Sequence, residues 1–135
     1  MAVVAVETEG AASFAAAYEA GDTTVCLPAI DSIATSLGAL QVCSTSVEHA
    51  ARHPGGVHTA VVSDADAINA CASFLADHRL LVEPACAAAL SLFYTRGHDS
   101  LLQSFRDVAV VVCGGSGVNH EILRTWQSQL NSGPQ

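Results

Sequence analysis

The chain has 135 residues, half of them apolar, which is enough for one domain with a buried core. Its formal net charge is −8, and its lysine and arginine side chains are five scattered arginines, so we expect it to bind neither nucleic acid nor a membrane surface. Lysine is absent, so no side chain of these residues can form a Schiff base with a carbonyl compound.

The five cysteines lie far apart, form no C-x-x-C pair and are odd in number. This pattern favours free thiols in a reducing, cytoplasmic environment over a disulfide framework. We expect four of them to be small apolar residues, namely Cys26, Cys43, Cys71 and Cys86. The apolar run at residues 1–6 is too short to span a bilayer and has no charged leader, so we interpret it as a strand.

Hydrophobic periodicity, helix caps and the positions of glycine and proline predict the elements. In chain order they are a strand at 1–6, helices at 11–20 and 30–37, a strand at 39–43, helical turns at 47–52, a strand at 57–62, helices at 64–78 and 84–94, a strand at 108–113, a helix at 118–130 and a disordered tail at 131–135. The helix at 64–78 has the clearest start, because Ser63 is a good N-cap residue and Asp66 is an acid at N3.

The stretch 108–113 is a continuous run of mostly β-branched apolar residues that ends at glycines. Such a run is typical of a strand buried on both faces, and these strands belong to parallel sheets covered by helices. The predicted fold class is therefore α/β, with a mostly parallel sheet flanked by helices. Ligands bind at the carboxyl ends of strands in such sheets, so we expect Cys113 to lie at a ligand-binding rim. A chain that begins on a buried strand also suggests a segment of something larger.

Two motifs have an ordinary interpretation beside a functional one. The glycine-rich turn at 114–117 precedes a helix and could hold a phosphate, but it lacks a Walker lysine and the G-x-G-x-x-G spacing, so an ordinary strand-to-helix turn is favoured. His49 and His53 stand four residues apart and could share a metal ion, yet no third ligand is evident, so an exposed helix surface is favoured.

Two glutamates also stand at informative positions. Glu7 follows a buried strand, where a carboxylate must be exposed, hydrogen-bonded or bound to a cation. Backbone carbonyl groups at the neighbouring glycine turns could complete an oxygen shell for a monovalent ion. Glu83 precedes Pro84, and we expect it to cap its own helix or form a salt bridge.

Three segments are more specific together than any of them alone: 6–14 (VETEGAASF), 81–90 (LVEPACAAAL) and 110–115 (VVVCGG). In this order they resemble the C-terminal part of eukaryotic L-serine dehydratase/L-threonine deaminase, a pyridoxal-phosphate lyase of the tryptophan-synthase-β-like, fold type II group. The similarity covers nearly the whole chain, including residues 27–30 and 36–38.

The resemblance implies that residues 1–130 are the C-terminal segment of a pyridoxal-phosphate-dependent lyase domain, part of the large domain of a fold type II enzyme. It implies conversion of L-serine to pyruvate, or of L-threonine to 2-oxobutanoate, with release of ammonia. The substrates are then small amino acids, the location is cytoplasmic, and the metabolic context is amino-acid breakdown and gluconeogenesis. Full-length members of the family are typically homodimers.

The resemblance also implies roles for individual residues. Cys113 should face the pyridine nitrogen of pyridoxal phosphate, with Gly114 and Gly115 in the same cofactor-binding segment. A thiol, with an ordinary pKa of about 8.5, can hydrogen-bond that nitrogen but is a poor proton source for it. The family's ligands of a monovalent cation such as potassium correspond to Glu7, Ala11, Leu37 and Ala39, the last three through their carbonyl oxygens.

The chain departs from the family pattern in several places. The lysine that carries the cofactor and the Ser-Gly-rich phosphate loop are absent, Ala87 stands where a glycine is usual, and residues 116–118 replace a segment that commonly carries Asn and Ile. Three hypotheses follow: a partial sequence of a working ammonia-lyase, which we favour; a non-catalytic remnant or regulatory partner of such an enzyme; or a small-ligand-binding α/β module. The preference between serine and threonine stays open.

Overall fold

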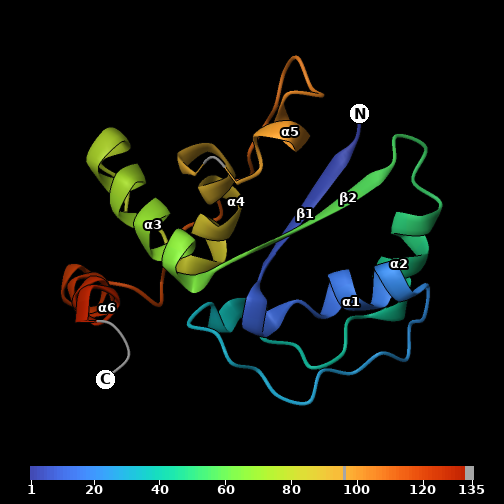
Figure 1. Cartoon of the computed structure of the whole chain (residues 1–135), viewed down its shortest axis with the longest axis horizontal. Helices are drawn as coiled ribbons and strands as arrows, with labels where there is room; N and C mark the ends of the chain where they lie inside the picture. The colour runs from blue at the N-terminus through green and yellow to red at the C-terminus, as the bar shows by residue number, and fades with distance from the viewer. Residues whose placement is uncertain (96, 133–135) are drawn as a thin grey trace. The chain divides into compact units, whose positions relative to one another are not determined.

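The computed structural model describes residues 1–95 and 97–132, which fold into two compact units, one within residues 1–62 and the other within residues 63–132. The first unit contains a parallel pair of strands, β1 (Val3–Thr8) and β2 (Val57–Val62), whose register runs from Val3 opposite Val57 to Thr8 opposite Val62 (Figure 1). Parallel strands need a long crossover, and residues 9–56 supply it. The α/β class with parallel strands and flanking helices is confirmed.

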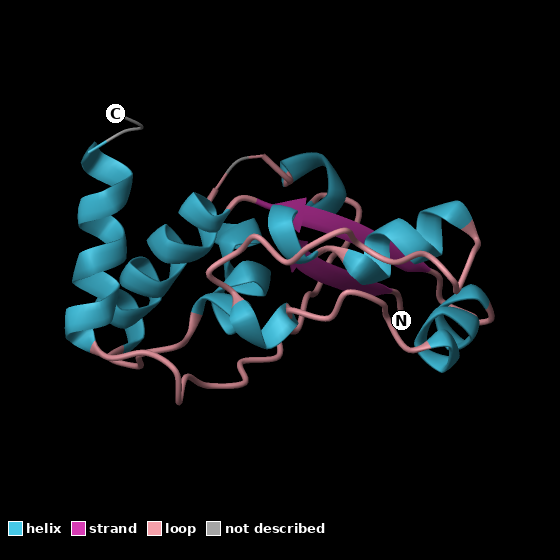
Figure 2. Ribbon diagram, turned by 90° about the horizontal axis from the view of Figure 1, so that it is seen from below, coloured by secondary structure: helices cyan, strands magenta, loops and turns pink. Residues whose placement is uncertain are grey.

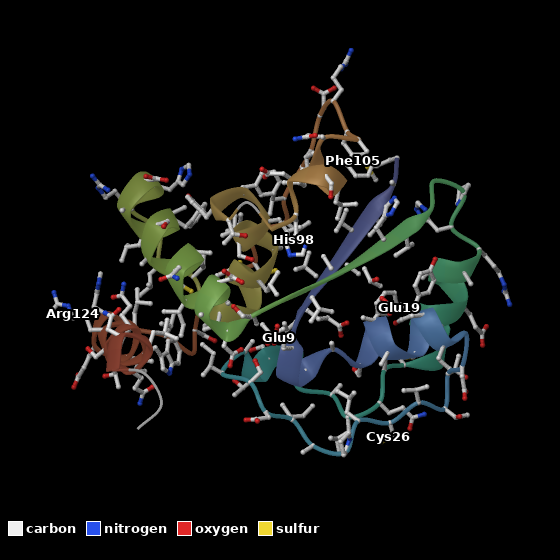
Figure 3. The ribbon with its side chains drawn as sticks, viewed as in Figure 1. Glu9, Glu19, Cys26, His98, Phe105 and Arg124 are labelled. Carbon is white, nitrogen blue, oxygen red and sulfur yellow. The ribbon has the colours of Figure 1, made fainter. Side chains whose placement is uncertain are left out.

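The crossover holds two helices and two short 3-10 turns. These are η1 (Glu9–Ala11), α1 (Ser13–Ala20), η2 (Thr35–Leu37) and α2 (Ser44–Ala51). Helix α1 ends at Gly21, whose φ of 63° lies in the left-handed region that glycine tolerates best. The Thr59 hydroxyl of β2 donates a 2.6 Å hydrogen bond to the carboxylate of Glu19 on α1 (Figure 3).

The second unit is helical. It consists of α3 (Asp64–His78), α4 (Pro84–Tyr94), α5 (Asp99–Leu102) and α6 (His120–Ser132) (Figure 2). Ser63 and Asp66 form the expected capping box at the start of α3, and Pro84 occupies the first turn of α4. Small side chains allow α3 and α4 to pack closely, and Ala67, Ala70, Ala87 and Ala88 are fully buried. None of the described helices is long and apolar enough to cross a bilayer.

Several predicted elements match the structure. Strand 57–62 and helices 64–78 and 84–94 have the predicted bounds, while β1 is displaced to 3–8 and α1 begins at Ser13 after a 3-10 turn. Helix α6 begins at His120 and includes residues 131–132 of the predicted tail. The remainder of that tail, residues 133–135, lies outside the described residues.

Two predictions in the crossover are wrong. Residues 30–37 form only the η2 turn, because tertiary contacts use their backbone groups: Asp31 N–H donates to the Gly10 carbonyl at 3.0 Å. Residues 39–43 form no strand, since Leu40 pairs only through its carbonyl, which accepts from Leu27 N–H at 2.8 Å. Without a neighbouring strand, a short apolar run gains no ladder of hydrogen bonds.

The predicted buried strand at 108–113 is also wrong for this chain. Residues 108–113 pair with no strand among the described residues, and Val111 is 78% exposed. A strand of this kind is stable only between neighbours that take its backbone hydrogen bonds and cover its faces. The sheet in the described residues therefore has two strands.

Candidate functional site

The predicted cofactor-binding residues meet the start of α4 within the second unit. The backbone N–H of Cys113 donates to the sulfur of Cys86 at 3.1 Å, and the N–H of Glu83 donates to the Gly114 carbonyl at 3.1 Å. Residues 83–86 and 113–114 are thus held together by two hydrogen bonds. Cys86 is 4% exposed, whereas the Cys113 side chain is exposed and available to a bound group.

The Cys86 side chain affects the ionisation of the Cys113 thiol. The nearby Cys86 side chain raises the pKa of the Cys113 thiol above its ordinary value, with smaller effects from desolvation and from Glu83. Because negative charge on Cys113 is disfavoured beside these groups, its thiol stays protonated at neutral pH. An exposed neutral thiol is a weak hydrogen-bond donor and acceptor, as expected for a residue facing an aromatic ring nitrogen.

The glycine turn is fixed by close contacts on one side and open on the other. At Gly115 an added Cβ would lie 2.6 Å from the backbone nitrogen of Glu83 and 2.9 Å from the Val82 carbonyl carbon. At Gly114, where φ is +121°, an added Cβ would meet no atom within 4 Å. The exposed Cys113 thiol and the open side of Gly114 leave room for a planar ring against this segment, and the assignment of that ring to pyridoxal phosphate stays a prediction.

The structure does not support a phosphate site at 114–117. Gly117 N–H already donates to a carboxylate oxygen of Glu83 at 3.3 Å, and that negative charge would repel an anion. The N-terminus of α6 is capped as well, since Ile122 N–H donates to the Asn119 side chain at 2.9 Å. The alternative interpretation, an ordinary turn that leads into a helix, is nearer to the structure. The segment before this turn, residues 108–113, is not a strand.

In the first unit, Glu7 is hydrogen-bonded, one of the three states predicted for it. Its carboxylate oxygens accept N–H groups of Phe14 at 2.9 Å and Ala15 at 2.8 Å. These are N2 and N3 of α1, whose N-cap residue, Ala12, has no capping side chain. The carboxylate therefore acts as the N-terminal cap of α1, where both the free amides and the helix dipole favour negative charge.

The other predicted cation ligands occupy two segments. Ala11 is fully buried in η1, at the carboxyl end of β1, while Leu37 and Ala39 lie in η2 and just after it. The Leu37 carbonyl accepts from Ala39 N–H at 2.8 Å. The segment before η2 contacts the end of β1, because the Thr8 and Ser32 hydroxyls are 2.8 Å apart. A monovalent-cation site at these positions stays a prediction.

The remaining motifs contribute nothing to these sites. His49 is exposed on α2, and the His53 ring nitrogen accepts a local hydrogen bond from Gly55 N–H at 3.2 Å. Within residues 1–95 and 97–132, no group of three or more His, Cys, Asp or Glu side chains could hold a metal ion.

Sequence reasoning missed the roles of Cys86 and Glu83. Cys86 was expected to be only a small apolar residue, and Glu83 to serve its own helix, yet both contact residues 113–117. Glu83 makes no side-chain cap on α4. The available signal was the position of both residues at the first turn of a helix that follows an apolar run, since such helix starts often lie at ligand-binding rims.

Known proteins resemble this chain over nearly its whole length. A family model described as "Pyridoxal-phosphate dependent enzyme" matches residues 1–114. The chain is 42% identical to "Serine dehydratase-like" of Rattus norvegicus, over 96% of this chain and 40% of that protein. It is 37% identical to "L-serine dehydratase/L-threonine deaminase" of Bos taurus, over 95% of this chain and 40% of that protein. It therefore spans about two fifths of the length of these relatives.

Solved structures give the same result. A crystal structure of a fungal L-serine ammonia-lyase from Rhizomucor miehei superposes with a TM-score of 0.88 and 38% identity, covering 96% of this chain and 41% of that one. Maize serine racemase superposes with a TM-score of 0.74 at 23% identity, over 96% of this chain and 39% of that one, which shows likeness of fold alone.

Proposed function

Because the chain belongs to the family of pyridoxal-phosphate-dependent enzymes, we propose that it is the C-terminal part of an L-serine and L-threonine ammonia-lyase. The reaction eliminates the β-hydroxyl group and yields pyruvate or 2-oxobutanoate with ammonia. The observation that supports this proposal best is the exposed Cys113 thiol, which Cys86 keeps protonated and residues 83–86 hold in place. Relatives that carry the names serine dehydratase and L-serine ammonia-lyase support the substrate class.

Pyridoxal phosphate, when bound, withdraws electrons from the substrate's α-carbon and so makes its α-proton acidic. The contribution of this chain is to position a neutral partner for the cofactor ring. Cys113 would hydrogen-bond the ring nitrogen of the bound cofactor without supplying a full proton, Gly114 leaves space beside it, and Gly115 keeps the turn close to Glu83.

A covalent attachment point is not among these 135 residues, because the sequence contains no lysine. We therefore propose that activity requires the family's lysine-bearing segment, supplied by further polypeptide. The proposal extends to residues 1–130 as one segment of the lyase domain, to a homodimeric, cytoplasmic enzyme, and to a potassium ion held by Glu7, Ala11, Leu37 and Ala39. These finer points rest on the resemblance.

The test is complementation. The chain is co-expressed with the lysine-bearing N-terminal part of the Rhizomucor miehei ammonia-lyase, and the visible absorbance of bound cofactor and the release of pyruvate from L-serine are measured. We expect both signals from the pair and neither from the chain alone. Cofactor absorbance without pyruvate or 2-oxobutanoate would favour the non-catalytic remnant, and absence of both signals from a soluble complex would contradict the proposal.

In the same complex, Cys113→Ala should lower turnover while leaving cofactor absorbance largely unchanged. The reason is that a methyl group cannot hydrogen-bond the ring nitrogen, whereas the other attachments of the cofactor remain. Cys26→Ala, an exposed cysteine of the first unit, is the matched control and should have no effect. Unchanged turnover in Cys113→Ala would remove Cys113 from the site.

A further inference from the structure

We propose that Cys86 and Cys113 are a redox pair, which a peroxide converts to an intramolecular disulfide. Both cysteines are free thiols in the structure. They come from segments 27 residues apart, and the structure brings them together at the first turn of α4. The inference stands on this geometry and does not depend on the proposed activity.

One contact places the side chains within reach of each other. The Cys86 sulfur lies 3.1 Å from the backbone nitrogen of Cys113, and that nitrogen is only two bonds from the Cys113 Cβ atom. A disulfide requires Cβ atoms roughly 3.5–4.5 Å apart, a separation that this contact brings within reach. Residues 108–113 lie outside any sheet, so the backbone at Cys113 can adjust to the bond geometry.

Exposure assigns the two thiols different steps. Cys113 is exposed and meets the oxidant first, while Cys86 is only 4% exposed and acts as the resolving thiol. Hydrogen peroxide transfers one oxygen to the Cys113 sulfur, giving a sulfenic acid and one water. The Cys86 sulfur then attacks the Cys113 sulfur, the S–S bond forms, and the hydroxyl group leaves as a second water with the thiol proton. Both sulfurs are oxidised, and the peroxide is reduced to two waters.

The third thiol of this unit is a poor competitor. Cys71 is fully buried on α3, out of reach of a dissolved oxidant. The same burial raises the pKa of its thiol to about 12. The partner of an oxidised Cys113 is therefore Cys86.

A disulfide would change the glycine turn. It would replace the N–H···S contact by a covalent bond and consume the Cys113 thiol, which the proposed function places against the cofactor ring. If that function holds, oxidation reversibly disables the site, and reduction restores it. This consequence, unlike the disulfide itself, rests on the proposed function.

The sequence makes the test direct, because trypsin can cleave this lysine-free chain only after arginine. Cys71, Cys86 and Cys113 then fall in separate peptides, 53–79, 80–96 and 107–124. The 135-residue chain, kept dispersed at low salt and cleared of aggregates by centrifugation, is treated with hydrogen peroxide, its remaining thiols are alkylated, and the non-reduced digest is analysed by mass spectrometry. We expect most of the oxidised Cys113 to appear in a species that joins peptides 80–96 and 107–124, with a mass two hydrogens below the sum of the two peptides.

Two controls separate proximity from chance. Cys71→Ser should leave the cross-link unchanged, and Cys86→Ser should abolish it and leave Cys113 as sulfenic or higher acids. The wild-type chain oxidised in guanidinium should lose its preference for this pair, which keeps the test decisive even if Cys86→Ser folds poorly. Cross-links from Cys113 mainly to Cys71, Cys26 or Cys43, or the same pattern in guanidinium, would overturn the proposal.

Discussion

Two exposed thiols show how local partners set reactivity at the scale of a residue. Cys43 is the N-cap residue of α2, and the nearby amide and side chain of Thr45 and the amide of Ser46 lower the pKa of its thiol. Cys113 has Cys86 and Glu83 beside it, and these raise the pKa of its thiol. Because both side chains are exposed, we expect their difference in reactivity to come from the difference in thiol pKa and not from solvent accessibility.

The expected outcome is faster alkylation of Cys43 than of Cys113 by iodoacetamide near neutral pH. At a pH below both pKa values, the group with the lower pKa has the larger thiolate fraction, and the thiolate is the nucleophile. The advantage should be several-fold rather than proportional to that fraction, because intrinsic nucleophilicity falls as pKa falls, and it should shrink as pH rises above both pKa values. Timed alkylation of a Cys26→Ser variant, read in peptides 1–52 and 107–124, measures both rates. Equal rates at pH 7 would contradict this prediction.

Glu7 is a second residue whose role is set by local hydrogen bonds, those of its two carboxylate oxygens. Its carboxylate accepts the N–H groups of Phe14 and Ala15, which would otherwise be unpaired amides at the buried start of α1. Glu7→Ala removes both acceptors and should destabilise α1 by about 1–2 kcal/mol. Glu7→Gln retains one acceptor oxygen and should have an intermediate effect.

Hydrogen–deuterium exchange measures this effect, since the amides of residues 13–20 should exchange faster in Glu7→Ala. A potassium-free buffer separates capping from the predicted cation site. Glu9→Gln is the control, because Glu9 is an exposed neighbour at the same end of β1 (Figure 3). Unchanged protection of α1 in Glu7→Ala would contradict the capping role.

At the scale of elements, α4 and the glycine turn depend on each other. Helix α4 begins with Pro84 and packs buried alanines against α3. Residues at its start, Glu83 and Cys86, accept hydrogen bonds from the backbone N–H groups of Gly117 and Cys113. A side chain at Gly115 would collide with backbone atoms of residues 82 and 83, which cannot move aside as a flexible side chain can. The glycine is therefore a packing requirement of this junction.

Gly115→Ala should push the turn away from α4, at a cost of about 1–3 kcal/mol. The displacement would uncover the Cys86 thiol, which is 4% exposed, so its labelling by a maleimide should accelerate. Gly97→Ala is the matched control in the same unit, because an added Cβ there meets no atom within 4 Å. Equal labelling of Cys86 in the two variants would show that the junction tolerates a methyl group.

At the scale of the whole molecule, the chain exposes much apolar surface. Met1, Leu80 and Val111 are each more than half exposed, and residues 108–112 pair with no strand among the described residues. Apolar patches and free strand-like edges promote association. The net charge of −8 opposes this through mutual repulsion between chains, which weakens as salt is added.

Expressed alone, the chain should therefore aggregate or bind a hydrophobic dye strongly, and aggregation should increase with salt. Co-expression with the lysine-bearing segment should suppress dye binding if that segment covers residues 108–113. Light scattering and dye fluorescence at two salt concentrations check this expectation. A monomer that unfolds cooperatively and binds little dye would contradict it.

The sequence by itself determined those elements whose signals lie within a short window. Helix α3 has its capping box at Ser63 and Asp66, α4 has Pro84 in its first turn, and β2 is a short apolar run between turn residues, so all three have the predicted bounds. The motifs around Glu7, Glu83 and Cys113, in this order, also identified the family. A combination of residue types can be recognised in the sequence without knowing which residues are neighbours in space.

Only the tertiary structure decided the partners of these residues. Residues 30–37 became a loop because Gly10 and Asp31 share a hydrogen bond, and residues 108–113 lost their strand because no neighbouring strand is present among the described residues. The contact between Cys86 and Cys113 joins positions 27 residues apart. Backbone pairing and burial are properties of atoms that meet in space, so a local pattern can predict that a residue needs a partner but not which partner it finds.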